Sequence, residues 1–84
     1  MNELELLKKK IKYRSSYRGT KEMDILLTKF INYVIDDLDY SELLKLDKFM
    51  NCKDEDIYNY YLGNNFTLDF DDKKILDLFK GFKM

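Results

Sequence analysis

A wide apolar face with helical spacing lies between residues 20 and 36, and it limits how this chain can fold more than any other feature. Its members recur three or four positions apart, as on one side of an α-helix. They are Met23, Leu26, Leu27, Phe30, Ile31, Val34 and Ile35. No segment alternates apolar and polar residues for long enough to predict a strand. We therefore expect an all-α protein with a helix over about residues 20–36 at the centre of its core.

Two more helices are predicted on either side of this central one. A helix over about residues 2–15 would bury Leu4, Leu7 and Ile11. Another begins after Asp39, because Asp39 and Glu42 have the spacing of a capping box, in which each side chain accepts from the other residue's backbone N–H. Its inward residues would be Leu43, Leu46, Phe49 and Met50.

The last third of the chain predicts two short helices joined by a loop through Asn64 and Asn65. We expect Asp54 to cap a helix over about residues 55–62, with Gly63 at its C-terminal cap. We expect Asp71 to cap a final helix over about residues 71–80, with Ile75, Leu76 and Phe79 inside. The predicted fold is a compact irregular bundle of about five short helices, forming a single domain over residues 1–84.

Composition supports a folded chain and reveals a charge asymmetry. The sequence has 84 residues, of which 45% are hydrophobic and 15% aromatic, enough for one modest core. Residues 1–21 hold seven Lys/Arg and two Glu, a net charge of +5. The remaining residues carry a net charge of −6, so the whole chain has a net charge of −1. A basic end could attract an acidic partner or nucleic acid, or it could be an ordinary solvated helix face.

The sequence lacks a pair of cysteines, a membrane-spanning stretch and a signal peptide, and these absences bear on its cellular location. The single cysteine, Cys52, cannot form an intramolecular disulfide, so nothing indicates an oxidising compartment. No stretch approaches about 18 apolar residues, and the acidic start is unlike a signal peptide. These absences indicate a bacterial cytoplasm or a mature organellar protein, and of the two we expect a cytoplasmic bacterial protein with no membrane partner.

The residues needed for catalysis are scarce. Histidine, the commonest general base and metal ligand, is absent, and Cys52 has neither a His nor a second Cys as partner. The acids at 69, 71 and 72 lack the spacing of a calcium loop, and the three glycines, at positions 19, 63 and 81, do not form the pattern of a phosphate-binding loop. We therefore expect no enzyme activity, no metal and no cofactor bound by the chain on its own account. Cys52 would fill space at a helix end.

Two arginines form the most unusual polar feature. The chain contains thirteen Lys but only two Arg, and both Arg14 and Arg18 lie within five residues. A guanidinium offers a planar, bidentate fork that lysine cannot mimic, which suits a carboxylate or phosphate on a partner. Gly19 follows at once, and Glu22 lies one helical turn beyond Arg18. A local pair between Arg18 and Glu22 at an ordinary helix–helix turn remains the alternative.

The residues around this feature resemble a known family. The run over residues 13–24, which reads Tyr-Arg-Ser-Ser-Tyr-Arg-Gly-Thr-Lys-Glu-Met-Asp, is similar to the signature of the small succinate dehydrogenase flavinylation factors, known in mitochondria as succinate dehydrogenase assembly factor 2. Their hallmark Arg-Gly-x-x-Glu is matched by Arg18, Gly19 and Glu22. The acidic-then-aromatic run over residues 54–62 is similar too, although Glu55 and Tyr60 stand where the family often has Pro and Trp.

The resemblance implies a five-helix protein that binds the flavoprotein subunit of succinate dehydrogenase or of fumarate reductase. Such a factor promotes covalent attachment of FAD to a histidine of that subunit. By carry-over, Arg18, Gly19 and Glu22 would contact the partner, with Arg14 and Asp24 flanking them. Direct contact with FAD does not follow from these residues.

Other interpretations stay open at this point. The chain could be a generic helical protein-interaction module, or a nucleic-acid-binding module that uses Lys8, Lys9, Lys10 and Lys12. The tyrosines at 58, 60 and 61 could form an exposed aromatic contact, or belong to the core with their hydroxyls at its rim. We expect the free protein to be a monomer.

Overall fold

The computed structural model describes residues 2–64 and 67–83, and every regular element within those ranges is helical. In chain order the elements are α1 (Glu3–Ser16), α2 (Lys21–Val34), a 3₁₀ turn η1 (Ile35–Asp37), α3 (Tyr40–Phe49), α4 (Asp54–Tyr61) and α5 (Lys73–Gly81). The prediction of an all-α fold with five short helices is confirmed. Asn65, part of the predicted loop, lies outside the described residues.

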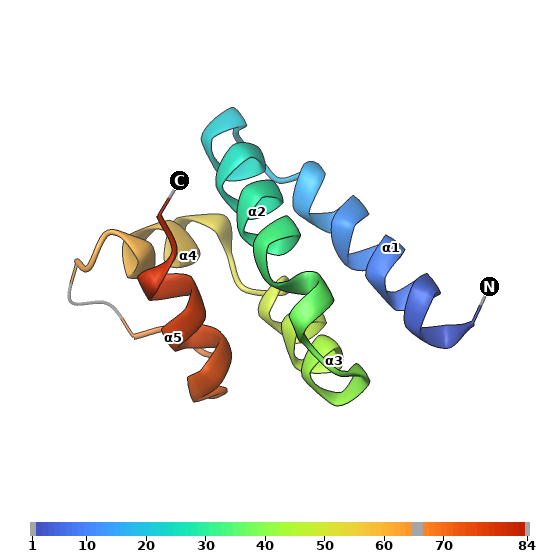
Figure 1. Ribbon diagram of the computed structural model, residues 1–84. Coiled ribbons are helices and arrows are strands. Elements are labelled where there is room, and N and C mark those ends of the chain that lie inside the picture. The colour runs from blue at the N-terminus through green and yellow to red at the C-terminus, as the bar shows by residue number, and fades with distance from the viewer. Residues whose placement is uncertain (1, 65–66, 84) are drawn as a thin grey trace.

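The central position of α2 is also confirmed. In Figure 1, α1 and α2 run in opposite directions as a helical hairpin, with α3 beneath them and α5 on the other side of α2. All seven residues of the predicted apolar face are buried, as Met23, Leu26, Leu27, Phe30, Ile31, Val34 and Ile35 are at most 4% exposed. The helix predicted to reach residue 36 ends at Val34, and η1 continues it.

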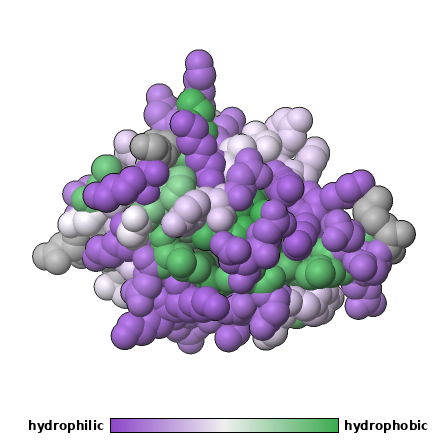
Figure 2. Space-filling view, in the orientation of Figure 1, coloured by the Kyte–Doolittle hydropathy of each residue, from purple (hydrophilic) through white to green (hydrophobic). Residues whose placement is uncertain are grey.

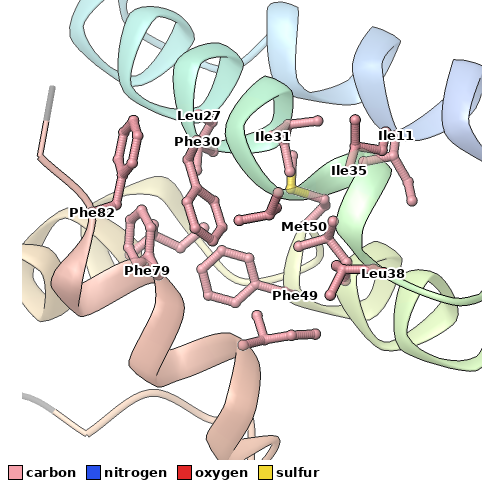
Figure 3. Packing of buried hydrophobic residues seen from close by; sticks show 14 of the residues in the cluster. Ile11, Leu27, Phe30, Ile31, Ile35, Leu38, Phe49, Met50, Phe79 and Phe82 are labelled. Carbon is pink, nitrogen blue, oxygen red and sulfur yellow. The ribbon is translucent and has the colours of Figure 1, made fainter.

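Aromatic rings from three helices and the C-terminal segment fill one half of the core. The Phe30 ring lies 4.8 Å from that of Phe79, 5.6 Å from Phe82 and 6.4 Å from Phe49, measured between centroids. Figure 3 shows these four rings turned toward one another, while Ile11, Ile31, Ile35, Leu38 and Met50 fill the other half. Because rings from α2, α3 and α5 meet here, this cluster joins the α1–α2 hairpin to the C-terminal helices.

The surface matches this division between core and solvent. Figure 2 shows hydrophilic residues over most of one face, with hydrophobic residues gathered in a band across its middle. Large apolar side chains with substantial exposure also occur, among them Tyr13, Tyr17, Tyr33, Leu6 and Leu62. Scattered exposure of this kind is normal for a small domain, so it identifies no site by itself.

Local capping signals fix most helix ends. The capping box is confirmed: the Glu42 N–H donates to Asp39 Oδ1 at 2.8 Å, and the Asp39 N–H donates to Glu42 Oε1 at 3.0 Å. Gly63 follows α4 with φ of 74°, the left-handed conformation that favours glycine after a helix. Thr20 caps α2 by accepting from the Met23 N–H at 3.2 Å.

Two of the predicted N-caps are wrong. The cap of α5 is Asp72 rather than Asp71, since Asp72 Oδ1 accepts from the Ile75 N–H at 3.0 Å. Asp54 does not cap α4 but is its first residue, and Lys53 occupies the N-cap position without a side-chain hydrogen bond. The Asp54 carboxylate is engaged instead by the loop between α1 and α2.

Candidate partner-binding site

The loop between α1 and α2 is closed by an internal hydrogen bond. The Arg18 backbone N–H donates to Asp24 Oδ1 at 2.6 Å, which ties the loop to the first turn of α2. Thr28 Oγ1 donates to the Ser15 carbonyl at 3.3 Å, linking the end of α1 to α2. Asp24, which the sequence predicted to flank the partner contact, is half-buried and stabilises the loop by this hydrogen bond.

The Arg18 guanidinium points into the molecule. Its side chain is only 11% exposed, and its Nε donates to Asp54 Oδ1 at 2.8 Å. Its Nη1 donates to the Met50 carbonyl at 3.0 Å, and its Nη2 to the Cys52 carbonyl at 3.2 Å. The alternative of a local Arg18–Glu22 pair is therefore not what the structure contains. Arg18 joins the α1–α2 loop to the segment between α3 and α4.

The second carboxylate oxygen of Asp54 binds Gly19, the next residue of the motif. Asp54 Oδ2 accepts from the Gly19 N–H at 2.7 Å. A Cβ atom added at Gly19 would lie 3.3 Å from that same oxygen, closer than most real Cβ contacts. An Arg-Gly pair therefore matches one carboxylate, with the guanidinium on one oxygen and an unobstructed amide on the other.

Arg14 forms a separate network between α1 and α3. Its Nη1 donates to Asp47 Oδ1 at 2.6 Å and to the Asp47 carbonyl at 3.0 Å, and its Nη2 donates to Asn51 Oδ1. Lys10 Nζ donates to the other carboxylate oxygen of Asp47 at 3.0 Å. Partial burial raises the pKa of Asp47, but the hydrogen bonds from Lys10 and Arg14 outweigh it, so the pKa lies below its ordinary value.

This lowered pKa predicts how acid affects the fold. A carboxyl whose pKa is lower in the folded state stabilises it fully above the ordinary value of 3.8, and the contribution disappears as the pH falls through the folded pKa. Asp47→Asn should therefore lose less unfolding free energy than the wild type between about pH 5 and about pH 2. Urea titrations followed by circular dichroism at both pH values measure this. Equal losses in the two proteins would contradict the assignment.

Glu22 and Gly19 share a depression of about 480 Å³ in the surface. Its walls come from the start of α2 and the first half of α4, and its lining residues are Gly19, Thr20, Glu22, Met23, Asp54, Glu55 and Tyr58. Met23 is buried in the floor, whereas Glu22 and Glu55 are exposed. The motif residues Gly19 and Glu22 therefore face solvent together, beside the largely covered Arg18.

The tyrosines of α4 divide between this depression and the core. Tyr58 is 39% exposed and lines the depression. Tyr60 and Tyr61 pack against the core, and the Tyr61 hydroxyl donates to the Phe82 carbonyl at 2.8 Å. Cys52 also packs against the core, as expected, and burial raises the pKa of its thiol.

Sequence reasoning missed the acceptors that organise this region. The local pattern at Asp54 predicts a helix cap, and no local pattern marks Asp47 or Asn51 as an acceptor. All three lie more than 30 positions from the arginines that donate to them. The useful signal was the rarity of arginine itself. A search for acids able to satisfy two guanidinium groups would have included both aspartates.

Residues 2–64 and 67–83 also bear on metal binding and on membrane insertion. No cluster of three or more potential metal-ligating side chains is found there. No helix in those ranges combines the length and apolar character needed to cross a membrane.

The architecture is that of a small helical protein with a motif-bearing depression between two helix ends, and its sequence matches one family over most of its length. Residues 9–83 match the family described as "Flavinator of succinate dehydrogenase". The chain belongs to this family.

Three curated relatives match this chain over different shares of their own length. "Succinate dehydrogenase assembly factor 2, mitochondrial" of Dictyostelium discoideum is 37% identical over 62 residues, 74% of this chain and 44% of that protein. "FAD assembly factor SdhE" of Pseudomonas aeruginosa is 28% identical over 64 residues, 76% of each chain. The protein of Penicillium rubens with the same name as the Dictyostelium one is 34% identical over 56 residues, 67% of this chain and 18% of its own. The match thus spans less than half of each mitochondrial relative.

Proposed function

We propose that this chain is an assembly factor that binds the flavoprotein subunit of succinate dehydrogenase or fumarate reductase and promotes covalent attachment of FAD to that subunit. The family match over residues 9–83 and the names of the relatives support the client. The observation that carries the proposal is that Gly19 and Glu22 of the family motif line one exposed depression together.

The proposed mechanism uses binding rather than catalysis by this chain. The client supplies the histidine that becomes bonded to FAD, and this chain holds the client in a conformation in which histidine and flavin are correctly placed. Holding reacting groups in a productive arrangement can remove a large part of a reaction barrier without any catalytic side chain on the binding protein. FAD is the client's cofactor, and this chain binds no cofactor of its own in the proposal.

Within this proposal the motif residues have different roles. Gly19 and Glu22 would contact the client directly, because they are exposed. Arg18 presents only a small part of its side chain, and Arg14 and Asp24 are half-buried and hydrogen-bonded within the chain. These three would flank the contact by holding the surface in shape.

The alternative of nucleic-acid binding through α1 has weaker support. Lys8 Nζ lies 3.2 Å from Asp36, and Lys10 Nζ lies 3.0 Å from Asp47, so two of the four lysines already face acids. Such pairing reduces the positive field that attracts phosphate. A generic interaction module would bind its partner without Glu22, which the next experiment tests.

Glu22→Gln should weaken binding to the flavoprotein subunit by about tenfold or more, as expected for a central contact of an interface. Glutamine keeps the size and helical character of the side chain and removes its charge. The matched control is Glu5→Gln, an exposed glutamate in the first turn of α1. That end of α1 lies away from the loop that joins α1 to α2 (Figure 1). Calorimetric titration against the subunit measures both. Equal affinity of Glu22→Gln and wild type would remove Glu22 from the contact.

The cellular setting follows the client. We propose the bacterial cytoplasm, since the Pseudomonas relative matches 76% of both chains. We also propose that the free protein is a monomer, which light scattering on the purified chain checks.

A further inference from the structure

We infer that Asp54, which lies outside the Arg-Gly-x-x-Glu motif, is a positioning residue that builds the partner-binding surface by holding the Arg18–Gly19 loop against α4. This inference rests on the proposed function. In this inference the Asp54 carboxylate connects the two walls of the depression, one carrying Glu22 and the other carrying Glu55 and Tyr58.

Arg18 and Gly19 form the hydrogen bonds that join the two walls. Within the described part of the chain, every hydrogen bond between residues 17–24 and residues 50–58 involves either Arg18 or Gly19. Two of these four bonds end on the Asp54 carboxylate, and the other two end on the carbonyls of Met50 and Cys52. Asp54 is thus the only side chain that accepts across this junction in that part of the chain.

The position of Asp54 connects this network directly to the exposed surface. Asp54 is the first residue of α4, so Glu55 follows at once and Tyr58 lies one helical turn further. On the other side, the loop that Asp54 holds leads through Thr20 into the first turn of α2, where Glu22 lies. A shift at Asp54 therefore changes the separation between Glu22 and Tyr58, the two sides of the depression.

The chemistry of the junction requires a carboxylate. Each oxygen accepts from a different donor, Arg18 Nε at 2.8 Å and the Gly19 N–H at 2.7 Å. An asparagine has the same shape but only one acceptor oxygen, and its amide group would face one of these donors. Asp54→Asn therefore breaks one arm of the junction, while the Met50 and Cys52 carbonyls still hold the guanidinium.

Asp54→Asn should bind the flavoprotein subunit about tenfold more weakly than wild type while remaining folded. The matched control is Asp56→Asn, which removes the same charge from the same helical turn without touching the loop. Amide exchange of Gly19 should be faster in Asp54→Asn and unchanged in the control, because only the first variant disturbs its acceptor.

A double-mutant cycle with Glu22→Gln separates positioning from a simple loss of stability. If Asp54 acts through the placement of Glu22, the two substitutions together should weaken binding much less than the product of their separate effects. Independent effects would multiply, and that result would overturn the inference. If Asp54→Asn melts below the assay temperature, Arg18→Lys replaces it, since the compact ammonium of lysine lacks the planar fork whose three nitrogens reach Asp54, Met50 and Cys52 separately. It should show the same non-multiplicative coupling, and wild-type affinity or multiplicative effects would overturn the inference.

The remaining outcomes are distinguishable. A wild-type chain that fails to bind the flavoprotein subunit would overturn the proposed function and this inference with it. A wild-type chain that binds, with a folded Asp54→Asn that binds equally well, would overturn the inference alone.

Discussion

Arg18→Ala is expected to lower the free energy of unfolding by about 3 kcal/mol, because it leaves one carboxylate oxygen of Asp54 and two backbone carbonyls without the guanidinium as donor. The Arg18 side chain is 11% exposed and that of Asp54 is 25% exposed, so water replaces these bonds only in part. Urea denaturation followed by circular dichroism measures the change.

The control for this variant is Lys12→Ala, an exposed basic residue of α1. Surface substitutions of this kind usually change stability by less than about 0.5 kcal/mol. A loss in Arg18→Ala no larger than that of the control would mean that the internal network contributes little. The guanidinium would then be free to serve a partner.

Phe30→Ala is expected to cost about 3–5 kcal/mol, the usual range for removing a fully buried aromatic side chain. Phe30 is 0% exposed and its ring lies within 6.4 Å of three other phenylalanine rings, so a cavity would open where α2, α3 and α5 meet. Small domains have only about 5–15 kcal/mol of total stability, so this variant should melt at a much lower temperature.

Phe30→Leu is the matched comparison for the cavity. Leucine refills part of the space, so its melting temperature should lie between those of the wild type and Phe30→Ala. Thermal melts followed by circular dichroism rank the three proteins. If Phe30→Ala melted with the wild type, the aromatic cluster would not be the centre of the core.

Local sequence signals were sufficient for the helices. The apolar face from Met23 to Ile35 predicted the buried side of α2 and the buried first residue of η1, because helical periodicity depends only on neighbours within two turns. The Asp39–Glu42 capping box was equally predictable, since both of its hydrogen bonds join residues three positions apart.

Contacts between distant segments could not be read in the same way. Asp54 has the local pattern of a helix cap, and only the fold brings it to Arg18, 36 positions earlier. Asp71 and Asp72 are adjacent acids before the same helix, and no local pattern favours the second as the cap. In both places the type of element was predicted correctly and the role of the carboxylate was not.

The candidate site shows the same limit in its arginines. Their rarity beside thirteen lysines indicated that guanidinium forks are required in this region. The structure provides acceptors for both within the chain, on Asp47, Asn51, Asp54 and two backbone carbonyls. The motif therefore combines residues that shape the surface with Gly19 and Glu22, which are exposed on it.

The most direct test of the central claim is an in-gel fluorescence assay for covalently bound flavin. The cognate flavoprotein subunit is incubated with FAD alone, with the wild-type chain, or with Glu22→Gln, then denatured and separated so that only covalent flavin remains. We predict a fluorescent band that forms faster with the wild-type chain than with FAD alone, and more slowly with Glu22→Gln than with wild type. Equal band formation with and without the wild-type chain, on a folded subunit, would contradict the proposed function.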